Sequence, residues 1–217
     1  MIKIVGISGS PVSNGNTEVL LGEVLSFISK PKDVETALIL LSRKEIQGCR
    51  HCNWCVKNQT ESQYCTLHDD MKEIYPEIAL ADGILLASPV HAGRLSGLMA
   101  NALDRMRVFK YGKIHKNKLQ DKVGGAIAVA FKRDGGLETT LLSLNSFFNT
   151  YRMIMIGWGA TGLTSSDGKG KIKKGQPHQI LEDAYGLKSA QNLAERMVDL
   201  CFVLNGMRNE KKFGRKI

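Results

Sequence analysis

The chain opens with MIKIVGISGSPVSNGNT, residues 1–17, and no other stretch says more about its architecture. Ile2 to Ser8 reads as a buried strand, and a small, polar, glycine-containing loop then leads into a helical pattern from Thr17. Such a loop would aim its backbone N–H groups and the helix dipole at an anion. It lacks both the Gly-Lys-Ser/Thr ending of a nucleoside-triphosphatase loop and the Gly-x-Gly-x-x-Gly spacing. The segment predicts either a phosphate site built from neutral donors or a tight turn capped by Asn16.

Beyond this loop, apolar runs alternate with helical patterns along the chain. The expected strands are Ile2–Ser8, Val34–Leu41, Gly83–Ala87, Gly124–Phe131 and Met153–Trp158. The expected helices are Thr17–Ser29, a segment opened by Asp69-Asp70 and running to Ala79, Leu95–Val108, Leu137–Tyr151 and Ala184–Leu204. Strands separated by helices indicate a three-layer α/β fold around a doubly wound five-stranded parallel sheet. Ligands of such a sheet bind on loops beyond the carboxyl ends of its strands.

Two later loops have the right position and composition for a flat ligand. Ser88-Pro89-Val90-His91-Ala92-Gly93 follows the third strand, and Phe131-Lys132-Arg133-Asp134-Gly135-Gly136 follows the fourth. Proline restricts the backbone, and the small residues leave room for a ring. Together with the first loop they predict a mononucleotide site. His91 either touches that ligand or faces solvent, and Asp104-Arg105 is expected to be a structural ion pair or a subunit contact.

Four of the five cysteines lie within seventeen residues, in an excursion over residues 45–68 that shows no clear periodicity. They are Cys49, Cys52, Cys55 and Cys65. Repeated Cys-x2-Cys units are typical of iron–sulfur or zinc ligation. Three interpretations remain open: an iron–sulfur cluster, a zinc site in which His51 or His68 could replace a thiolate, and a relict motif of buried or redox-active thiols. Cys201 falls among apolar residues of the last helix and is expected to be a core thiol.

Composition and charge argue against a membrane-spanning protein and against a nucleic-acid-binding protein. At 217 residues, 43% hydrophobic and 24% charged, the chain is long enough for a three-layer core. No apolar run is long enough to span a bilayer, so we expect a cytoplasmic protein without membrane contact. Much of the net charge of +9 sits in the lysines of residues 169–174 and in a basic tail. Without interleaved aromatic residues these charges do not favour nucleic-acid binding.

The motifs resemble those of a known superfamily. They are Ser8-Gly9-Ser10-Pro11, Asn14-Gly15-Asn16-Thr17, Asp69-Asp70-Met71, Ala81-Asp82-Gly83, Ser88-Pro89-Val90 and Asp104-Arg105. They are similar to the flavodoxin-like, NADPH-dependent FMN reductases, and the four cysteines ahead of Asp69 make the chain similar to the iron–sulfur flavoproteins within that superfamily. There are two departures: nine residues separate Cys55 from Cys65, more than in most relatives, and His91 stands where relatives often carry an aromatic residue.

The resemblance implies a flavodoxin-like FMN-binding domain over residues 1–205, with residues 45–68 as an inserted cluster loop and residues 206–217 as a basic C-terminal tail. It implies FMN phosphate binding by Ser8, Ser10, Ser13, Asn14, Gly15, Asn16 and Thr17. Contacts to the isoalloxazine would come from Pro89, Val90, His91 and Ala92, with Arg133, Gly135 and Gly136 on the third loop. It also implies a four-iron, four-sulfur cluster on the four cysteines.

The first functional hypothesis is an FMN-dependent electron-transfer flavoprotein that carries this cluster and exchanges electrons with a small molecule or a protein such as a ferredoxin. No side-chain acid or base is required, since the cofactors carry the chemistry. The alternative is an NAD(P)H-dependent FMN or quinone reductase without a cluster. A third hypothesis is a non-enzymatic zinc-bearing regulatory or nucleic-acid-binding module. The resemblance further implies a homodimer or homotetramer.

Overall fold

The computed structural model describes residues 1–165 and 167–214. The strands are β1 (Ile2–Ser8), β2 (Val34–Leu40), β3 (Gly83–His91), β4 (Arg94–Leu95), β5 (Val123–Ala130), β6 (Ile154–Met155) and β7 (Ala160–Leu163). The α-helices are α1 (Asn16–Ile28), α2 (Trp54–Lys57), α3 (Met71–Leu80), α4 (Gly97–Arg105), α5 (Arg107–Tyr111), α6 (Leu137–Thr150) and α7 (Ala184–Gly214). Two short 3₁₀ helices are η1 (Leu41–Arg43) and η2 (Gln179–Glu182).

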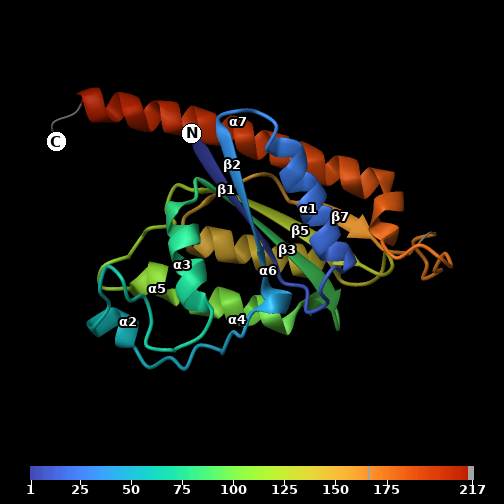
Figure 1. Cartoon of the computed structure of the whole chain (residues 1–217), viewed down its shortest axis with the longest axis horizontal. Helices are drawn as coiled ribbons and strands as arrows, with labels where there is room; N and C mark the ends of the chain where they lie inside the picture. Colours follow the sequence, from blue (N-terminus) through green and yellow to red (C-terminus); the bar gives the residue numbers. More distant parts are fainter. Residues whose placement is uncertain (166, 215–217) are drawn as a thin grey trace.

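The sheet has the strand order β2-β1-β3-β5-β6, and all of these neighbours pair in parallel. This order reverses direction between β1 and β3, which confirms the doubly wound, flavodoxin-like arrangement. Figure 1 shows α1 and α7 on one side of the sheet and α3, α4 and α6 on the other. The three-layer α/β fold expected from the alternation of patterns is therefore present.

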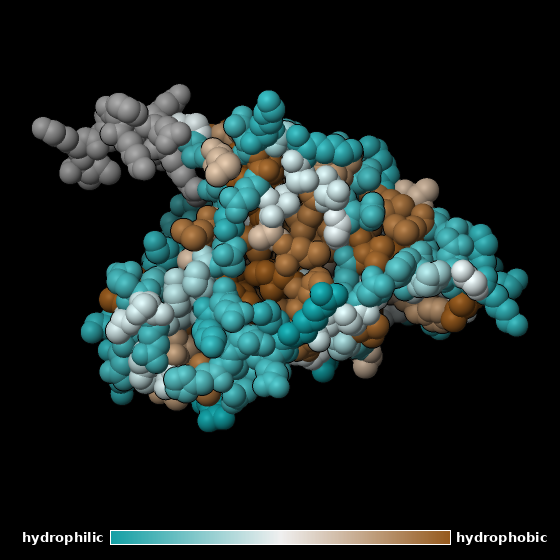
Figure 2. Space-filling model, viewed as in Figure 1, coloured by the Kyte–Doolittle hydropathy of each residue, from teal (hydrophilic) through white to brown (hydrophobic). Residues whose placement is uncertain are grey.

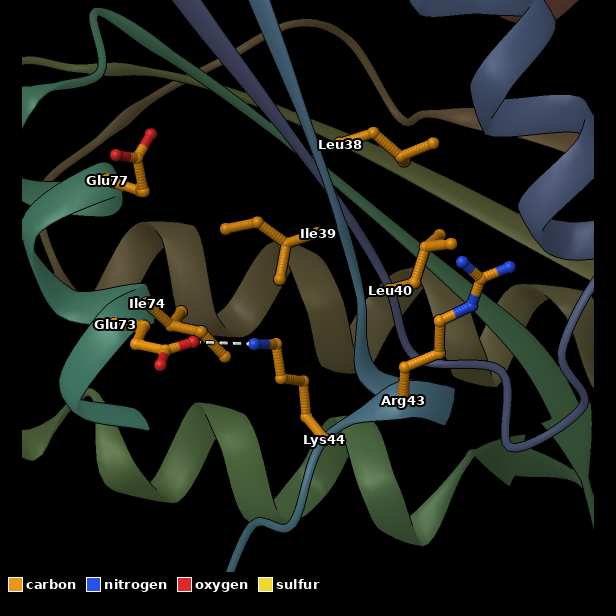
Figure 3. Close-up of a pocket in the computed structure, with 8 residues that line it drawn as sticks. All are labelled: Leu38, Ile39, Leu40, Arg43, Lys44, Glu73, Ile74 and Glu77. Carbon is orange, nitrogen blue, oxygen red and sulfur yellow. Dashed lines mark hydrogen bonds and ion pairs between the residues drawn. The ribbon is translucent and has the colours of Figure 1, made fainter. Parts of the chain in front are cut away.

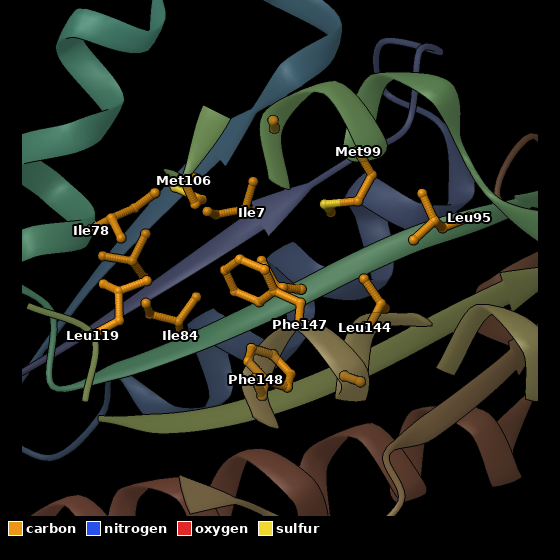
Figure 4. Close-up of a cluster of buried hydrophobic side chains, with 14 of the residues drawn as sticks. Ile7, Ile78, Ile84, Leu95, Met99, Met106, Leu119, Leu144, Phe147 and Phe148 are labelled. Carbon is orange, nitrogen blue, oxygen red and sulfur yellow. The ribbon is translucent and has the colours of Figure 1, made fainter. Parts of the chain in front are cut away.

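Two apolar clusters, one on each face, hold the layers together. Along β1, Val5 and Ile7 belong to the cluster under α3, α4 and α6, whereas Ile2 and Ile4 belong to the cluster under α1 and α7. Side chains alternate between the faces of a strand, so a strand buried on both sides must be apolar throughout. Figure 4 shows the first cluster, with Phe147 and Phe148 of α6 packed against the sheet. Cys201 is buried in the second cluster, as expected.

The sheet has seven strands rather than the five expected, for two local reasons. Of the predicted strand Met153–Trp158 only Ile154–Met155 is extended, as β6, and a separate strand that was not predicted, β7 (Ala160–Leu163), pairs with the later part of β5. Gly157 and Gly159 between them have φ values of +59° and +119°, which an extended strand cannot accommodate. In addition, β3 runs on to His91 and turns back into β4, so α4 begins at Gly97 and not at Leu95.

The C-terminal part also differs in detail from the expected tail. Helix α7 continues through Gly214, and residues 215–217 of the predicted tail lie outside the described residues. None of the described helices could cross a membrane.

Candidate functional site

The loops after β1, β3 and β5 meet at one edge of the sheet because the three strands end in register. Ser8 pairs with Ala87, and Pro89 pairs with Val129. The Gly9 N–H donates to the Ala87 carbonyl at 2.8 Å, and Ser96 Oγ donates to the Gly9 carbonyl at 2.5 Å. An added Cβ on Gly9 would lie 2.6 Å from Cβ of Met99 on α4, so this close approach requires glycine. The phosphate loop (residues 8–17) is thus held against the second loop.

The phosphate loop ends at the N-terminus of α1, which no side chain caps. Gly15, not Asn16, is the N-cap of α1, and no side chain caps the helix. Asn16 Oδ1 instead accepts from the Ile180 N–H at 3.0 Å, so the predicted Asn16 cap is wrong. No hydrogen bond recorded within the described residues uses the backbone N–H of Asn16 or Thr17. These donors, together with the helix dipole, make the segment suited to an anion.

Short-range hydrogen bonds shape this loop. Ser10 Oγ donates to the Val12 carbonyl at 3.2 Å and accepts from the Val12 N–H at 3.1 Å. The buried carboxylate of Glu18 accepts from the Asn14 N–H at 2.7 Å and from Ser42 Oγ at 2.5 Å. Ser13 and Asn14 remain exposed, whereas Ser8, Ser10 and Thr17 are buried. Sequence analysis missed Glu18; an acid in the first turn of the helix was the available signal.

The second loop is a β-hairpin rather than an irregular connection. His91 pairs with Arg94, and the two residues between them, Ala92 and Gly93, have φ values of +49° and +77°. Two consecutive left-handed residues define the tight turn that matches strand twist. Pro89 and Val90 are half-buried beneath it, while the His91 side chain is exposed.

The third loop packs directly on this hairpin. Gly136 has a φ of +95°, and an added Cβ would lie 2.7 Å from the Cα and carbonyl oxygen of Gly93. Thr139 Oγ1 also donates to the Gly93 carbonyl. Arg133 is exposed, and its backbone N–H donates to the Gly168 carbonyl at 3.0 Å. The structure therefore brings all three predicted loops together, with the side chains of His91 and Arg133 open to solvent.

The four clustered cysteines line a single small pocket away from these loops. Cys55 is buried, Cys49 and Cys65 are half-buried, and Cys52 is exposed. His51 and Asn53, which flank Cys52, have φ values of +50° and +58°, and this double turn lets the repeated Cys-x2-Cys unit curl around the pocket. Burial raises the pKa of the Cys55 thiol; the Arg107 charge opposes this shift, and the other three thiols add to it.

No three Cys, His, Asp or Glu side chains in residues 1–165 and 167–214 form a group that could hold a metal ion. A zinc site needs its ligands about 2.0–2.3 Å from one point. Among the described side chains, the geometry thus supports neither the zinc interpretation nor the cluster interpretation. The nine-residue gap before Cys65 does not keep that residue from the pocket.

A buried ion pair between Arg105 and Asp69, the residue that directly follows the cysteine excursion (residues 45–68), holds the two ends of the excursion together. Arg105 Nη1 lies 2.5 Å from Asp69 Oδ2 and Nη2 lies 3.0 Å from Oδ1, with both side chains almost fully buried. Arg105 Nη1 also donates to the Gln47 carbonyl, and Asp69 Oδ2 accepts from the Gln47 N–H at 2.9 Å. Sequence analysis paired Arg105 with Asp104, which is exposed. Adjacent helical residues face different directions, so a neighbour in sequence is a poor partner.

An aromatic cluster supports the Cys65 side of the excursion. The Tyr64 ring stacks on Tyr75 and His115, with centroid separations of 5.2 Å and 4.0 Å. The buried Gln59 amide donates to the Tyr64 and Val108 carbonyls and accepts from the N–H groups of residues 114 and 115. The pocket is therefore built on a packed base, not on a free loop.

A separate groove of about 330 Å³ lies between the edge strand β2 and α3. Figure 3 shows its lining, which includes Leu38, Ile39 and the exposed ion pair of Lys44 with Glu73. Figure 2 shows apolar atoms in the hollow over this part of the sheet. The lining contains no cysteine; it meets the phosphate loop through Leu40, which pairs with Ser8 in the sheet, and through Arg43, which donates to Ser13 Oγ at 3.4 Å. The groove is not part of the candidate site.

The comparisons with known proteins agree with this geometry. Residues 2–166 match the NADPH-dependent FMN reductase family. The chain is 36% identical over 206 residues to an iron–sulfur flavoprotein of Methanocaldococcus jannaschii, covering 92% of this chain and 97% of that protein. It is 29% identical over 212 residues to an iron–sulfur flavoprotein of Methanosarcina thermophila, covering 96% and 100%.

The fold is shared with solved structures of low sequence similarity. The Trp repressor binding protein of Bacillus subtilis superposes with a TM-score of 0.61 at 20% identity, covering 88% of this chain and 99% of that one. On these grounds the chain belongs to the NADPH-dependent FMN reductase family, as a relative of the iron–sulfur flavoproteins, and is a flavin-dependent oxidoreductase.

Proposed function

We propose that this flavoprotein binds FMN at the three convergent loops, holds a four-iron, four-sulfur cluster on Cys49, Cys52, Cys55 and Cys65, and transfers electrons between them and an external partner. The observation that carries the proposal is the gathering of all four cysteines around one pocket, in a chain whose full-length relatives are named iron–sulfur flavoproteins.

The residues present fit the flavin phosphate. The N–H groups at the start of α1 supply donors, and the buried Ser8, Ser10 and Thr17 hydroxyls belong to the same loop as the exposed Ser13 and Asn14. Glu18 holds the Asn14 backbone in place at 2.7 Å. The exposed Arg43 side chain, which donates to Ser13 Oγ at 3.4 Å, adds the one cation in contact with this loop among the described hydrogen bonds.

The isoalloxazine would contact the second and third loops through residues 89–92 and residues 133, 135 and 136. Pro89 and Val90 offer a half-buried apolar surface, and the hairpin turn at residues 92–93 is kept in shape by its contact with Gly136. His91 and Arg133 are exposed and free to meet the ring or a substrate. These residues bind and orient; none needs to transfer a proton.

The proposal of a cluster is supported by the four cysteines that line one pocket and by their repeated Cys-x2-Cys spacing, which is typical of iron–sulfur ligation. Bound together, FMN would exchange two electrons at a time and the cluster would pass them singly. The chain's own part is to hold the thiolates and to shield Cys55 from water. The external partner would be NAD(P)H, a quinone or a protein such as a ferredoxin, and the protein would be a cytoplasmic homodimer or homotetramer.

The test is to quantify iron, acid-labile sulfide and flavin on one anaerobic preparation of the wild-type protein and two variants. Cys52→Ser should lose iron and sulfide while keeping flavin, because the exposed Cys52 thiol is a ligand with no role in packing. Cys201→Ala, in the second core cluster far from the pocket, should keep all three. Full iron and sulfide content in Cys52→Ser would contradict the proposed ligand set.

A second candidate is a cluster-free NAD(P)H-dependent FMN or quinone reductase. It is favoured by the family match and by the absence of a group of metal ligands within the described ranges. Yellow, iron-free protein that oxidises NADPH after anaerobic reconstitution with iron and sulfide would establish this candidate over the first.

A further inference from the structure

Three arginines line the same pocket as the four cysteines. Arg50 is exposed and donates to Gln47 Oε1 at 2.9 Å, whereas the side chains of Arg105 and Arg107 are less exposed. Arg105 ends α4 and Arg107 begins α5, and both side chains reach the pocket with the thiols. No acidic side chain is among the described residues that line it. Arg105 and Arg107 each also have a buried Nε–H for which the described residues offer no hydrogen-bond partner. Buried N–H donors are nearly always paired, so both atoms need an explanation.

Arg105 and Arg107 differ in how their charge is balanced. Arg105 is neutralised by Asp69 through two hydrogen bonds, and a third joins it to the Gln47 carbonyl. The charge of Arg105 is therefore already balanced, and the side chain holds the two ends of the excursion together.

Among the described side chains, Arg107 has no such counter-ion. Its Nη2 donates to Asn53 Oδ1 at 2.7 Å, and its guanidinium lies 4.5 Å from the centroid of the Tyr111 ring. Asp104 lines an adjoining groove with Arg107, but no ion pair joins them in the described part of the chain. A half-buried cation held by neutral groups is costly unless an anion lies nearby. The pocket with its four thiols is where such an anion would lie.

We propose that Arg107 is the counter-ion of the metal cluster: its charge and its unpaired Nε–H compensate the negative charge on the four cysteine thiolates and the inorganic sulfur. This inference rests on the proposed function, since it requires the cluster. Four thiolates around a doubly positive cluster core leave a net charge of about −2, and uptake of one electron from a reductant makes it more negative without breaking a bond to cysteine. A fixed cation stabilises the more negative state, so Arg107 raises the reduction potential.

Arg107 would position the cysteine loop and tune the reduction potential of the cluster. Both roles depend on the backbone conformation of residues 52–55. Asn53, which holds the Arg107 guanidinium, has a left-handed φ of +58° and lies between Cys52 and Cys55. The same hydrogen bond therefore ties the Cys-x2-Cys unit to α5. Arg107 both fastens the ligand loop and faces the charge that the loop would carry.

The experiment compares three variants as anaerobically reconstituted full-length protein. Arg107→Gln removes the charge, Arg107→Lys keeps it while losing the planar fork, and Lys57→Gln removes an exposed charge two residues from Cys55 that does not line the pocket. Iron, sulfide and flavin are quantified, and the midpoint potential of the cluster is measured by a dithionite titration followed by electron paramagnetic resonance.

We expect Arg107→Gln to weaken electron uptake about tenfold, which equals a fall of 59 mV for a one-electron couple. The midpoint potential of Arg107→Lys should fall by less than that of Arg107→Gln. The midpoint potential of Lys57→Gln should stay at the wild-type value, because exposed charges are screened. Loss of iron from Arg107→Gln but not from Arg107→Lys would equally support the role of the charge.

A cluster-loaded Arg107→Gln variant with the wild-type potential would overturn the inference. So would equal behaviour of all three variants, or loss of iron from both Arg107 variants alike, which would indicate packing and not charge. If wild-type protein takes up no iron and sulfide, the proposed function fails instead, and the two failures are thereby distinguished.

Discussion

The phosphate loop and the cysteine excursion are both irregular, and both make long-range hydrogen bonds, but the phosphate loop also has a set of local ones. The phosphate loop is shaped by hydrogen bonds between residues two to four apart, such as Ser10 with Val12 and Asn14 with Glu18. The excursion is closed by an ion pair between residues 36 apart in sequence and by contacts of Arg105 with Gln47. Local bonds form with little loop-closure entropy, whereas the long-range clamp must offset it. We therefore expect the excursion to depend more than the phosphate loop on a few buried groups.

The largest effect is expected when the charge of Asp69, the partner of Arg105, is removed. Asp69→Asn leaves the buried Arg105 guanidinium unpaired, and breaking one side of a buried pair costs about 3–5 kcal/mol. The free energy of unfolding, measured by urea titration, should fall by that amount. Asp104→Asn, which removes an exposed acid next to Arg105, is the control and should change it by no more than about 0.5 kcal/mol. Equal effects of the two variants would show that Asp104 is the true partner.

Acid should weaken the ion pair between Asp69 and Arg105 that holds the excursion. Burial alone would raise the pKa of Asp69, but hydrogen bonds from Arg105, Gln47 and Met71 outweigh it and hold the pKa below its ordinary value. A carboxylate with a lowered pKa stabilises the fold above its unfolded pKa of about 3.9 and loses that contribution as the pH falls through the folded value.

Unfolding free energies of wild type and Asp69→Asn, measured from neutral pH to well below the unfolded pKa of about 3.9, should therefore converge at the acid end of the titration. The difference should be constant at neutral pH, where Asp69 is ionised in both the folded and the unfolded state. A difference that persists undiminished at the lowest pH would contradict the assignment of the clamp to the ionised carboxylate.

The smallest effect is expected at the contact between the phosphate loop and the second loop. Ser96 caps α4 through the Met99 N–H at 3.0 Å and donates to the Gly9 carbonyl at 2.5 Å. Ser96→Ala should cost about 1–2 kcal/mol of unfolding free energy through the lost cap and the unpaired carbonyl. Ser29→Ala, on an exposed hydroxyl at the end of α1, should change the same quantity little. If Ser96→Ala lowered the free energy of unfolding as much as Asp69→Asn does, the proposed difference between the phosphate loop and the cysteine excursion would be wrong.

The phosphate loop could be predicted from the sequence, whereas the contacts that hold the cysteine excursion could not. The phosphate loop and the strand ends were recognisable because glycine, serine and asparagine between a strand and a helix have few other uses. The hairpin at residues 92–93 was missed, although Ala-Gly between His91 and Arg94 was the available signal. Arg105 with Asp69 and Arg107 with Asn53 were beyond sequence reasoning, because both pairs join segments that meet only after α4 and α5 pack against the excursion.

The sequence by itself determined the alternation of buried strands and helices, the three loops at one edge of the sheet, and the candidate ligands at Cys49, Cys52, Cys55 and Cys65. These are local patterns, and periodicity or spacing reveals them without knowledge of neighbours. Only the tertiary structure decided that all four cysteines reach one pocket and that Asp69 and not Asp104 neutralises Arg105. It also decided that Arg107 has no anionic partner among the described side chains. The physical reason is that burial and charge pairing depend on distances between segments remote in sequence, which no local pattern records.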